Sequence, residues 1–355
     1  MTNREKILSN DYYDLITDYI MPPRVRESAG DYVYQLISGE IGVTYINRAD
    51  VMMPMSVSNF TYSIIPKVFG LMQTQQMDSF DPTALLRSGI TQVQGDALNL
   101  TGRGVVIGFL DTGIRYDEAV FRNPDGSTRI LGIWDQTIQS GDPPAGILYG
   151  TEYKRETIDL ALQSENPREI VPSYDDIGHG TAIASVAAGS VLRSGIEFTG
   201  AAPQADIVMV KLKQAKQHLR EFYLIPDEVP AYAESDIMVA LRYLESYAIS
   251  LARPLVICFG LGTNMGDHEG ISIMADYLNQ IATKRSRAVV VCGGNEGNSA
   301  HHYLGSATEG LAETTDNVEI RVEEGTRGFT AELWGCVPAK HAIAIRTPGG
   351  EVTPK

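Results

Sequence analysis

Three short motifs place polar side chains able to do chemistry among small residues. Asp111 ends the apolar run 104–110, His179 lies in Gly-His-Gly-Thr, and Asn295 lies in Gly-Gly-Asn-Glu-Gly. A carboxylate, an imidazole and an amide can together move a proton and stabilise a developing negative charge. Taken singly, each has an ordinary structural explanation, because Asp and Asn are common turn residues and a histidine can begin a helix or lie in a core.

The elements that must position these residues are short apolar runs alternating with helix-compatible segments. Strands are expected at 104–110, 205–211, 254–259 and 288–292, and helices at 179–191, 237–247 and 270–285. Strands that are apolar throughout indicate a parallel sheet with helices on both faces. An Asp at the carboxyl end of such a strand lies where open α/β sheets place their ligand and catalytic groups.

The flanking segments differ in character. Residues 1–76 predict a small α+β unit, with a helix at 11–20 and strands at 31–38, 41–46 and 62–66. A short helix is expected at 83–88, the polar segment 116–176 predicts no regular element, and residues 318–322, 329–333 and 341–345 alternate like half-buried antiparallel strands. The expected domains are therefore an N-terminal unit at 1–76, an α/β domain at 77–305 and the beginning of a β-rich domain at 306–355.

Composition restricts the partners. The chain has 355 residues and a formal net charge of −15, which argues against nucleic acid and anionic membranes. The N-terminus lacks an apolar signal region, and no run approaches the ~20 residues that span a bilayer, so we expect cytoplasmic synthesis. Cys258, Cys292 and Cys336 lack metal-ligand spacing and predict buried thiols. A dinucleotide fingerprint is disfavoured because Gly102-Arg103-Gly104 precedes its strand.

Taken together and in this order, the three motifs resemble those of the subtilisin-like serine proteases. Residues 200–203 (Gly-Ala-Ala-Pro) resemble the family's GxAP turn, residues 256–262 its glycine-rich cleft rim, and the likeness covers about residues 80–305. The resemblance implies a subtilisin-like fold and protein or peptide substrates. It also implies roles for individual residues, with Asp111 and His179 in the catalytic triad, Asn295 as oxyanion donor, and Gly260, Leu261 and Gly262 binding substrate.

The nucleophile of that family is missing from the printed sequence. The expected G-T-S-x-A-x-P-type motif does not occur, and Gly297-Asn298-Ser299-Ala300 is a superficial match. We do not assign Ser299 as nucleophile, because one short loop is a poor source for both oxyanion donor and nucleophile. Gly260 also departs from the serine usual in the rim, which leaves detailed subsite preference open.

A subset of the family, the clostridial Csp germination proteases, is similar to this chain in more detail. They carry a jelly-roll-like insertion between the Asn and the Ser, an N-terminal prodomain and no secretory signal. Residues 293–303 fit that group. The resemblance implies that Lys355 falls inside the insertion, that this chain is truncated before its serine and is inactive alone, and that the whole enzyme processes a spore-germination proenzyme and is spore-associated.

By the same resemblance, residues 1–76 are a prodomain, the protein's own partner, whose tail within 65–76 lies in the cleft. Its apolar residues would fill the subsites, and these are Val68, Phe69, Leu71 and Met72. An unrelated N-terminal domain stays open as an alternative. So does a pseudoprotease that acts by binding a partner, although Asp111 and His179 show no sign of lost catalysis.

Metal binding is left unassigned. Subtilases often bind calcium, and oxygen donors are available in the loops at Asp125, Asp142, Asp175 and Asp176. Acidic loops are more often solvated surfaces. We therefore expect no cofactor and name no metal ligand.

Overall fold

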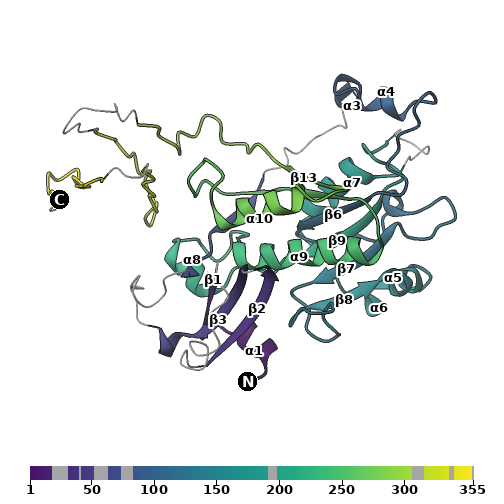
Figure 1. The fold of residues 1–355 in the computed structure, drawn as a ribbon, viewed down its shortest axis with the longest axis horizontal. Helices are drawn as coiled ribbons and strands as arrows, with labels where there is room; N and C mark the ends of the chain where they lie inside the picture. Colours follow the sequence, from purple (N-terminus) through teal and green to yellow (C-terminus); the bar gives the residue numbers. More distant parts are fainter. Residues whose placement is uncertain are drawn as a thin grey trace.

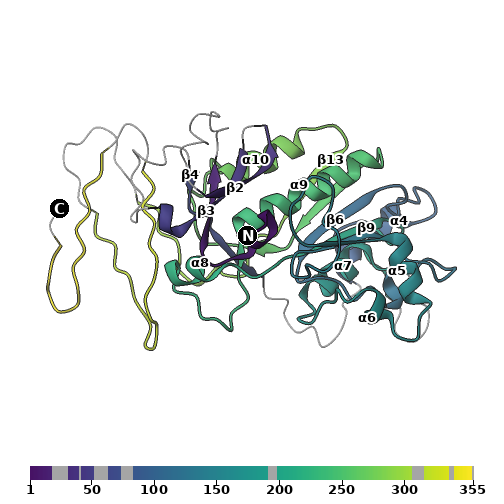
Figure 2. The ribbon, with the colours of Figure 1, turned by 90° about the horizontal axis from the view of Figure 1, so that it is seen from below.

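A computed structural model describes residues 1–17, 31–39, 41–51, 63–72, 83–190, 198–305, 316–335 and 340–353. Two sheets dominate it. The N-terminal sheet lies beside the helices that cover one face of the larger sheet (Figure 1). Described residues 316–335 and 340–353 lie to one side of both sheets (Figure 2), where the Gly266 N–H donates to the Glu332 carboxylate at 2.7 Å.

The larger sheet has six strands in the order β13-β11-β6-β9-β7-β8. All neighbours run parallel except β8, which pairs antiparallel with β7 at one edge. Its strands are β6 (Val106–Asp111), β7 (Ile130–Asp135), β8 (Thr151–Lys154), β9 (Asp206–Lys211), β11 (Leu255–Phe259) and β13 (Arg287–Val291). The predicted parallel sheet is confirmed.

Helices cover both faces of this sheet, as predicted. Successive residues of β6 point to opposite faces. Leu110 points to the face that is covered by α9 (Glu234–Ser250) and α10 (Ile273–Ala282), and it belongs to the same buried cluster as residues of these helices. Phe109 packs on the other face with α5 (Arg155–Leu162) and α7 (His179–Ala188). By the same alternation Asp111 shares the face of Phe109, which is the face of α7.

The N-terminal unit is a four-stranded antiparallel sheet in the order β2-β3-β1-β4. It consists of α1 (Asn3–Leu8), β1 (Tyr12–Thr17), β2 (Tyr32–Ser38), β3 (Ile41–Asn47), η1 (Arg48–Asp50) and β4 (Ser63–Ile64). The predicted helix at 11–20 is wrong over its described part, because the aromatic and β-branched run Tyr-Tyr-Asp-Leu-Ile-Thr pairs with β3 along its whole length. Residues 18–20 lie outside the described residues.

The two units share one apolar core. Ile16, Val43 and Tyr45 of the N-terminal sheet belong to the same buried cluster as Met238 and Leu241 of α9. A buried ion pair also joins the units, with Lys216 Nζ 2.6 Å from Asp14 Oδ1. The N-terminal unit is therefore packed on the α/β unit through both apolar and charged contacts.

A small third sheet joins the two units. Its order is β10-β5-β12, with both pairings antiparallel. The central strand β5 (Val68–Leu71) comes from the N-terminal unit, whereas β10 (Tyr232–Ala233) and β12 (Leu261–Gly262) come from the α/β unit. Part of the tail expected within 65–76 is thus a strand.

The polar segment 116–176 is more regular than its sequence indicates. It contains η2 (Ala119–Phe121), β7, β8, α5 and α6 (Pro167–Ile170). β7 is fully buried between β9 and β8, and its short run Ile-Leu-Gly-Ile-Trp-Asp is flanked by turns. The other α-helices among the described residues are α3 (Thr83–Arg87), α4 (Ile90–Gln94) and α8 (Gln217–Phe222).

Two other predictions fail. The strands expected at 318–322, 329–333 and 341–345 are not formed; within described residues 316–335 and 340–353 only the isolated bridge between Arg346 and Val352 occurs. The apolar side chains there are exposed, and paired strands need a covered face to be stable. Cys292 is also exposed rather than buried, since it follows the edge strand β13, while Cys258 is partly buried. Cys336 lies outside the described residues.

Candidate active site

Two elements bring Asp111 and His179 together. Asp111 ends β6 and His179 begins α7, and their side chains are 2 % and 5 % exposed. The distance from His179 Nδ1 to Asp111 Oδ1 is 2.7 Å. Asp111 Oδ1 also accepts the Thr112 N–H at 2.7 Å, which fixes the carboxylate.

Glycine is required on both sides of His179. Gly178 precedes the helix at φ 93°, in the left-handed region that glycine adopts without strain. A Cβ on Gly180 would lie 2.3 Å from the carbonyl oxygen of Gly113 and 3.0 Å from Asp111 Cβ. The first turn of α7 therefore approaches the end of β6 closely enough for the imidazole to reach Asp111.

Both ring nitrogens of His179 contact acceptors. Nδ1 faces the Asp111 carboxylate, and Nε2 lies 2.6 Å from the Met72 carbonyl oxygen. Because neither oxygen can donate, both nitrogens must carry a proton in this arrangement. Burial alone would lower the pKa of His179, but the hydrogen bond and charge of Asp111, with contributions from Met72 and Asp175, raise it. The imidazolium is thus the form that this conformation favours.

Residues 68–72 form an extended segment that leads to His179. Leu71 is paired with Leu261 and Gly70 with Gly262 on one side, while Phe69 is paired with Tyr232 on the other. Strand addition of this kind is how extended peptides bind to sheet edges. The sequence indicated the rim at 260–262 but not the strand at 232–233 on the other side of β5, which has only two residues.

The predicted rim residues lie at the site. A Cβ on Gly260 would lie 3.4 Å from Asp111 Oδ2 and 3.9 Å from His179 Cε1. A Cβ on Gly262 would lie 1.8 Å from Met72 Cε, and one on Gly294 would lie 3.9 Å from Met72 Sδ. The absence of a side chain at Gly262 therefore leaves the space that the Met72 side chain occupies, whereas the Gly294 distance is an ordinary contact.

Asn295 follows β13 in an exposed bend. Because β13 runs parallel to β11 and β6, Asn295 lies at the same sheet edge as Asp111. Ser299 lies four residues further, in a turn where its N–H donates to the Glu296 carbonyl at 2.9 Å. This local turn gives no support for Ser299 as a nucleophile.

Three of the four acidic residues considered for calcium have other side-chain contacts, and these are Asp125, Asp175 and Asp176. Asp175 is fully buried and accepts four hydrogen bonds, which leaves it unsuited to a cation. Asp125 accepts from the N–H and hydroxyl of Ser127, and Asp176 lies 3.6 Å from Lys211 Nζ. Among the described residues no three His, Cys, Asp or Glu side chains gather as a metal site would require.

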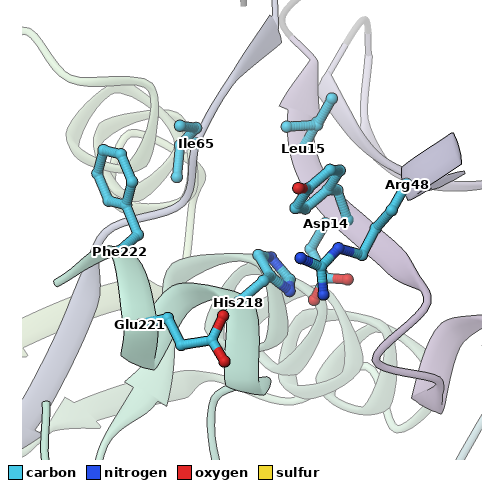
Figure 3. A pocket seen from close by; sticks show the side chains of 8 residues that line it. Asp14, Leu15, Arg48, Ile65, His218, Glu221 and Phe222 are labelled. Atoms are coloured by element: carbon cyan, nitrogen blue, oxygen red, sulfur yellow. The ribbon is translucent and has the colours of Figure 1, made fainter. Parts of the chain in front are cut away.

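A separate hollow lies between the N-terminal unit and α8 (Figure 3). It is lined by Tyr13, Asp14, Leu15, Arg48, Ile65, His218, Glu221 and Phe222. His218 is 8 % exposed, and neither of its ring nitrogens has a hydrogen-bond partner among the described residues. None of the lining residues belongs to the Asp111–His179 site.

The fold and this site define a subtilisin-type architecture. The model of the subtilase family (peptidase S8) matches residues 102–318, more than half of the chain, so the chain belongs to the subtilases. It is similar to the solved CspB protease of Clostridium perfringens, with 34 % identity and a TM-score of 0.52 over 62 % of this chain and 42 % of that one. The expected likeness to the Csp type is thereby confirmed.

Curated relatives are serine proteases. The chain is 29 % identical over 130 residues to serine protease AprX of Bacillus subtilis (strain 168), covering 37 % of this chain and 21 % of AprX. It is 27 % identical over 237 residues to the subtilisin-like protease SBT3.5 of Arabidopsis thaliana, covering 59 % of this chain and 28 % of SBT3.5. The chain thus spans less than a third of the length of either curated relative. Among the described helices none has the length and apolar character needed to cross a bilayer.

Proposed function

We propose that the chain carries the cleft and the acid–base pair of a subtilisin-type serine endopeptidase, with residues 1–76 as its prodomain. The observation that carries this proposal is the position of β5. Its backbone pairs with both cleft rims, and the carbonyl of the following residue, Met72, lies against His179 Nε2. A substrate or product peptide bound in this site would likewise present a backbone carbonyl close to His179, the proposed base.

In the proposed reaction His179 Nε2 takes the proton of a serine hydroxyl as that oxygen adds to the scissile carbonyl. The same nitrogen then gives the proton to the leaving amine, and a water repeats the two steps to release the acid. Asp111 keeps Nδ1 protonated and stabilises the imidazolium. The Asn295 amide would donate to the oxyanion, which is the role that the resemblance to the subtilases implies.

The serine itself is not supplied by the motifs of the printed sequence. We propose that it comes from a segment beyond Lys355, and that residues 1–355 alone do not hydrolyse peptides. The intact Asp111–His179 pair favours an enzyme over a pseudoprotease. From the Csp likeness we further propose that the physiological substrate is a proenzyme of spore germination.

The bond proposed to be cleaved within the chain is Met72–Gln73. Met72 occupies the position next to His179, and the three residues before it hold the paired positions along the rims. Before cleavage of any other substrate, the Met72 carbonyl must leave Nε2, because that atom has to accept the serine proton. The prodomain would therefore inhibit by filling the cleft and by occupying the base.

The test uses the full-length reading frame. We expect mass spectrometry to find a new N-terminus at Gln73, and a fluorophosphonate probe to label a serine once the prodomain has left. His179→Ala should abolish both results, whereas His302→Ala, at an exposed position, should leave both intact. A full-length protein that folds but neither cleaves nor reacts would contradict the proposal.

A further inference from the structure

Asp175 lies in the segment before α7 and is fully buried. Its Oδ1 accepts the Thr112 hydroxyl at 2.8 Å and the Gly178 N–H at 2.7 Å. Its Oδ2 accepts the N–H and the hydroxyl of Thr181 at 2.8 Å and 2.6 Å. Each of the two carboxylate oxygens therefore accepts two hydrogen bonds.

These partners surround the catalytic pair without touching the reacting atoms. Thr112 directly follows Asp111, and its hydroxyl also accepts the Gly180 N–H at 2.9 Å. The N–H groups of Gly178 and Gly180, the residues on either side of His179, are thereby bound to the linked side chains of Asp175 and Thr112. Gly178, the N-cap of α7, has no side chain to satisfy the first N–H groups of the helix, and Asp175 does this from three residues earlier.

The linked side chains of Asp175 and Thr112 are the buried part of the polar contact between β6 and α7; beside them, the Arg115 N–H donates to the Thr181 hydroxyl at 3.0 Å. β6 is held in the sheet by β11 and β9, whereas α7 packs on the sheet through small side chains such as Ala184 and Ala188. Small apolar side chains permit a helix to slide, while hydrogen bonds to a carboxylate are directional and strong. The position of His179 relative to Asp111 therefore depends on a polar connection.

We propose that Asp175 is a positioning residue that sets the distance between the Asp111 carboxylate and the His179 imidazole by tying the end of β6 to the first turn of α7. This inference rests on the proposed function for its catalytic consequence, but its structural part concerns the His179 ring alone. It assigns Asp175 neither to a metal nor to the chemical steps.

The chain offers a matched control in the neighbouring residue. Asp176→Asn removes the same charge at a side chain that is 77 % exposed and lies 3.6 Å from Lys211 Nζ. Asp175→Asn instead replaces one oxygen with an amide N–H₂, which faces donors in either orientation, those of Thr112 and Gly178 or those of Thr181. Thr112→Val removes the hydroxyl that is bound to Asp175, and Thr112→Ser retains a hydroxyl at this position.

The first readout is turnover of a peptide by the full-length protein after prodomain removal. For Asp175→Asn and Thr112→Val we expect kcat to fall about 10²-fold, as a misplaced catalytic group does, with KM within about twofold because β10 and β12 are untouched. Loss of the Asp175 charge should also move the acid limb of the kcat/KM profile to lower pH. Asp176→Asn should change neither, and Thr112→Ser, which restores the hydroxyl, should recover most of the activity that Thr112→Val loses.

The second readout is the NMR titration of ring-labelled His179 in the same proteins, which needs no turnover. Asp175→Asn should lower the pKa of His179 and shift its Nδ1 proton signal, and Asp176→Asn should not. If Asp175→Asn and Thr112→Val both titrate like the unchanged protein and keep its kcat, the inference is overturned, even if Asp175→Asn has a lower melting temperature. If the unchanged protein has no activity but the titration differs as expected, the proposed function fails and the positioning role stands. Should Asp175→Asn not fold, Thr112→Val decides.

Discussion

At the scale of single residues, the Asp111–His179 contact decides whether the base can work. Asp111→Asn would keep the side-chain shape but place an amide N–H where His179 Nδ1 needs an acceptor 2.7 Å away. The ring would then be held in the wrong tautomer, and turnover by the full-length protein should fall by about 10⁴-fold with little change in KM. Asp125→Asn, which removes an exposed charge, is the control. A loss below about tenfold would mean that Asp111 does not orient the base.

Gly262 makes a second prediction at this scale. A Cβ there would lie 1.8 Å from Met72 Cε, so Gly262→Ala must displace the Met72 side chain. The rate of cleavage after Met72 should fall roughly 10- to 200-fold, the range that one methyl group is worth in an apolar pocket. Combining Gly262→Ala with Met72→Ala should restore most of the rate, followed by mass spectrometry over time. No recovery would indicate that the alanine disturbs β12 itself.

At the scale of elements, β5 holds the N-terminal unit in the cleft. Phe69 is 6 % exposed and packs edge-to-face on Phe259, with ring centroids 5.7 Å apart. Phe69→Ala should lower the free energy of unfolding by about 3–5 kcal/mol, because it leaves a cavity between the units. Denaturant unfolding measures this change. Leu36→Ala, at a position 42 % exposed on β2, should cost far less, and equal losses would contradict the role of β5.

Sequence patterns predicted the elements that carry long apolar runs. β6, β9, β11 and β13 were expected within a residue or two, and with them the edge of the sheet where Asp111 lies. Strands that depend on a partner distant in the sequence were not predicted. β10 and β12 have two residues each and exist as strands only because β5 lies between them. Asp175 was one of several loop acids, and nothing in its neighbours showed that four donors converge on it.

The failed predictions have the same physical origin. Tyr12–Thr17 suits either a helix or a strand until β3 is placed beside it. The alternating segments after residue 316 suit strands, but in the described part of the chain nothing covers their apolar side. Local propensity is a weak guide wherever tertiary partners decide the state.

At the scale of the whole molecule, docking of the N-terminal unit should depend on pH. His218 lies against the Tyr13 ring, with centroids 5.0 Å apart, and burial lowers its pKa to about 4 although Asp14 opposes this. Lys216, Arg48 and Lys213 act in the same direction as burial, and Glu221 lines the same hollow. Protonation of His218 is therefore suppressed while the units are docked.

The direction of the effect follows from linkage. The unfolded histidine, with a pKa of ~6.5, binds a proton between about pH 6.5 and 4 that the folded one does not, so stability rises with pH in this window and levels off above it. We expect a loss of roughly 1–3 kcal/mol on going from pH 6.5 to 4 from this residue. His218→Gln should flatten that part of the curve, measured by denaturant unfolding at several pH values. The exposed His302→Gln should leave it steep, and two identical curves would exclude His218 as the source.

The central place of β5 has a kinetic consequence. While Met72 and Gln73 are joined, the strand is tethered at both ends, so its rebinding is intramolecular, and dilution cannot release it. Short tethers of this kind correspond to effective concentrations in the millimolar range. After cleavage at Met72–Gln73 the same contacts would persist, but the N-terminal unit would be a separate ligand whose occupancy follows mass action. One broken peptide bond would thus convert a permanent inhibitor into one that leaves on dilution or degradation.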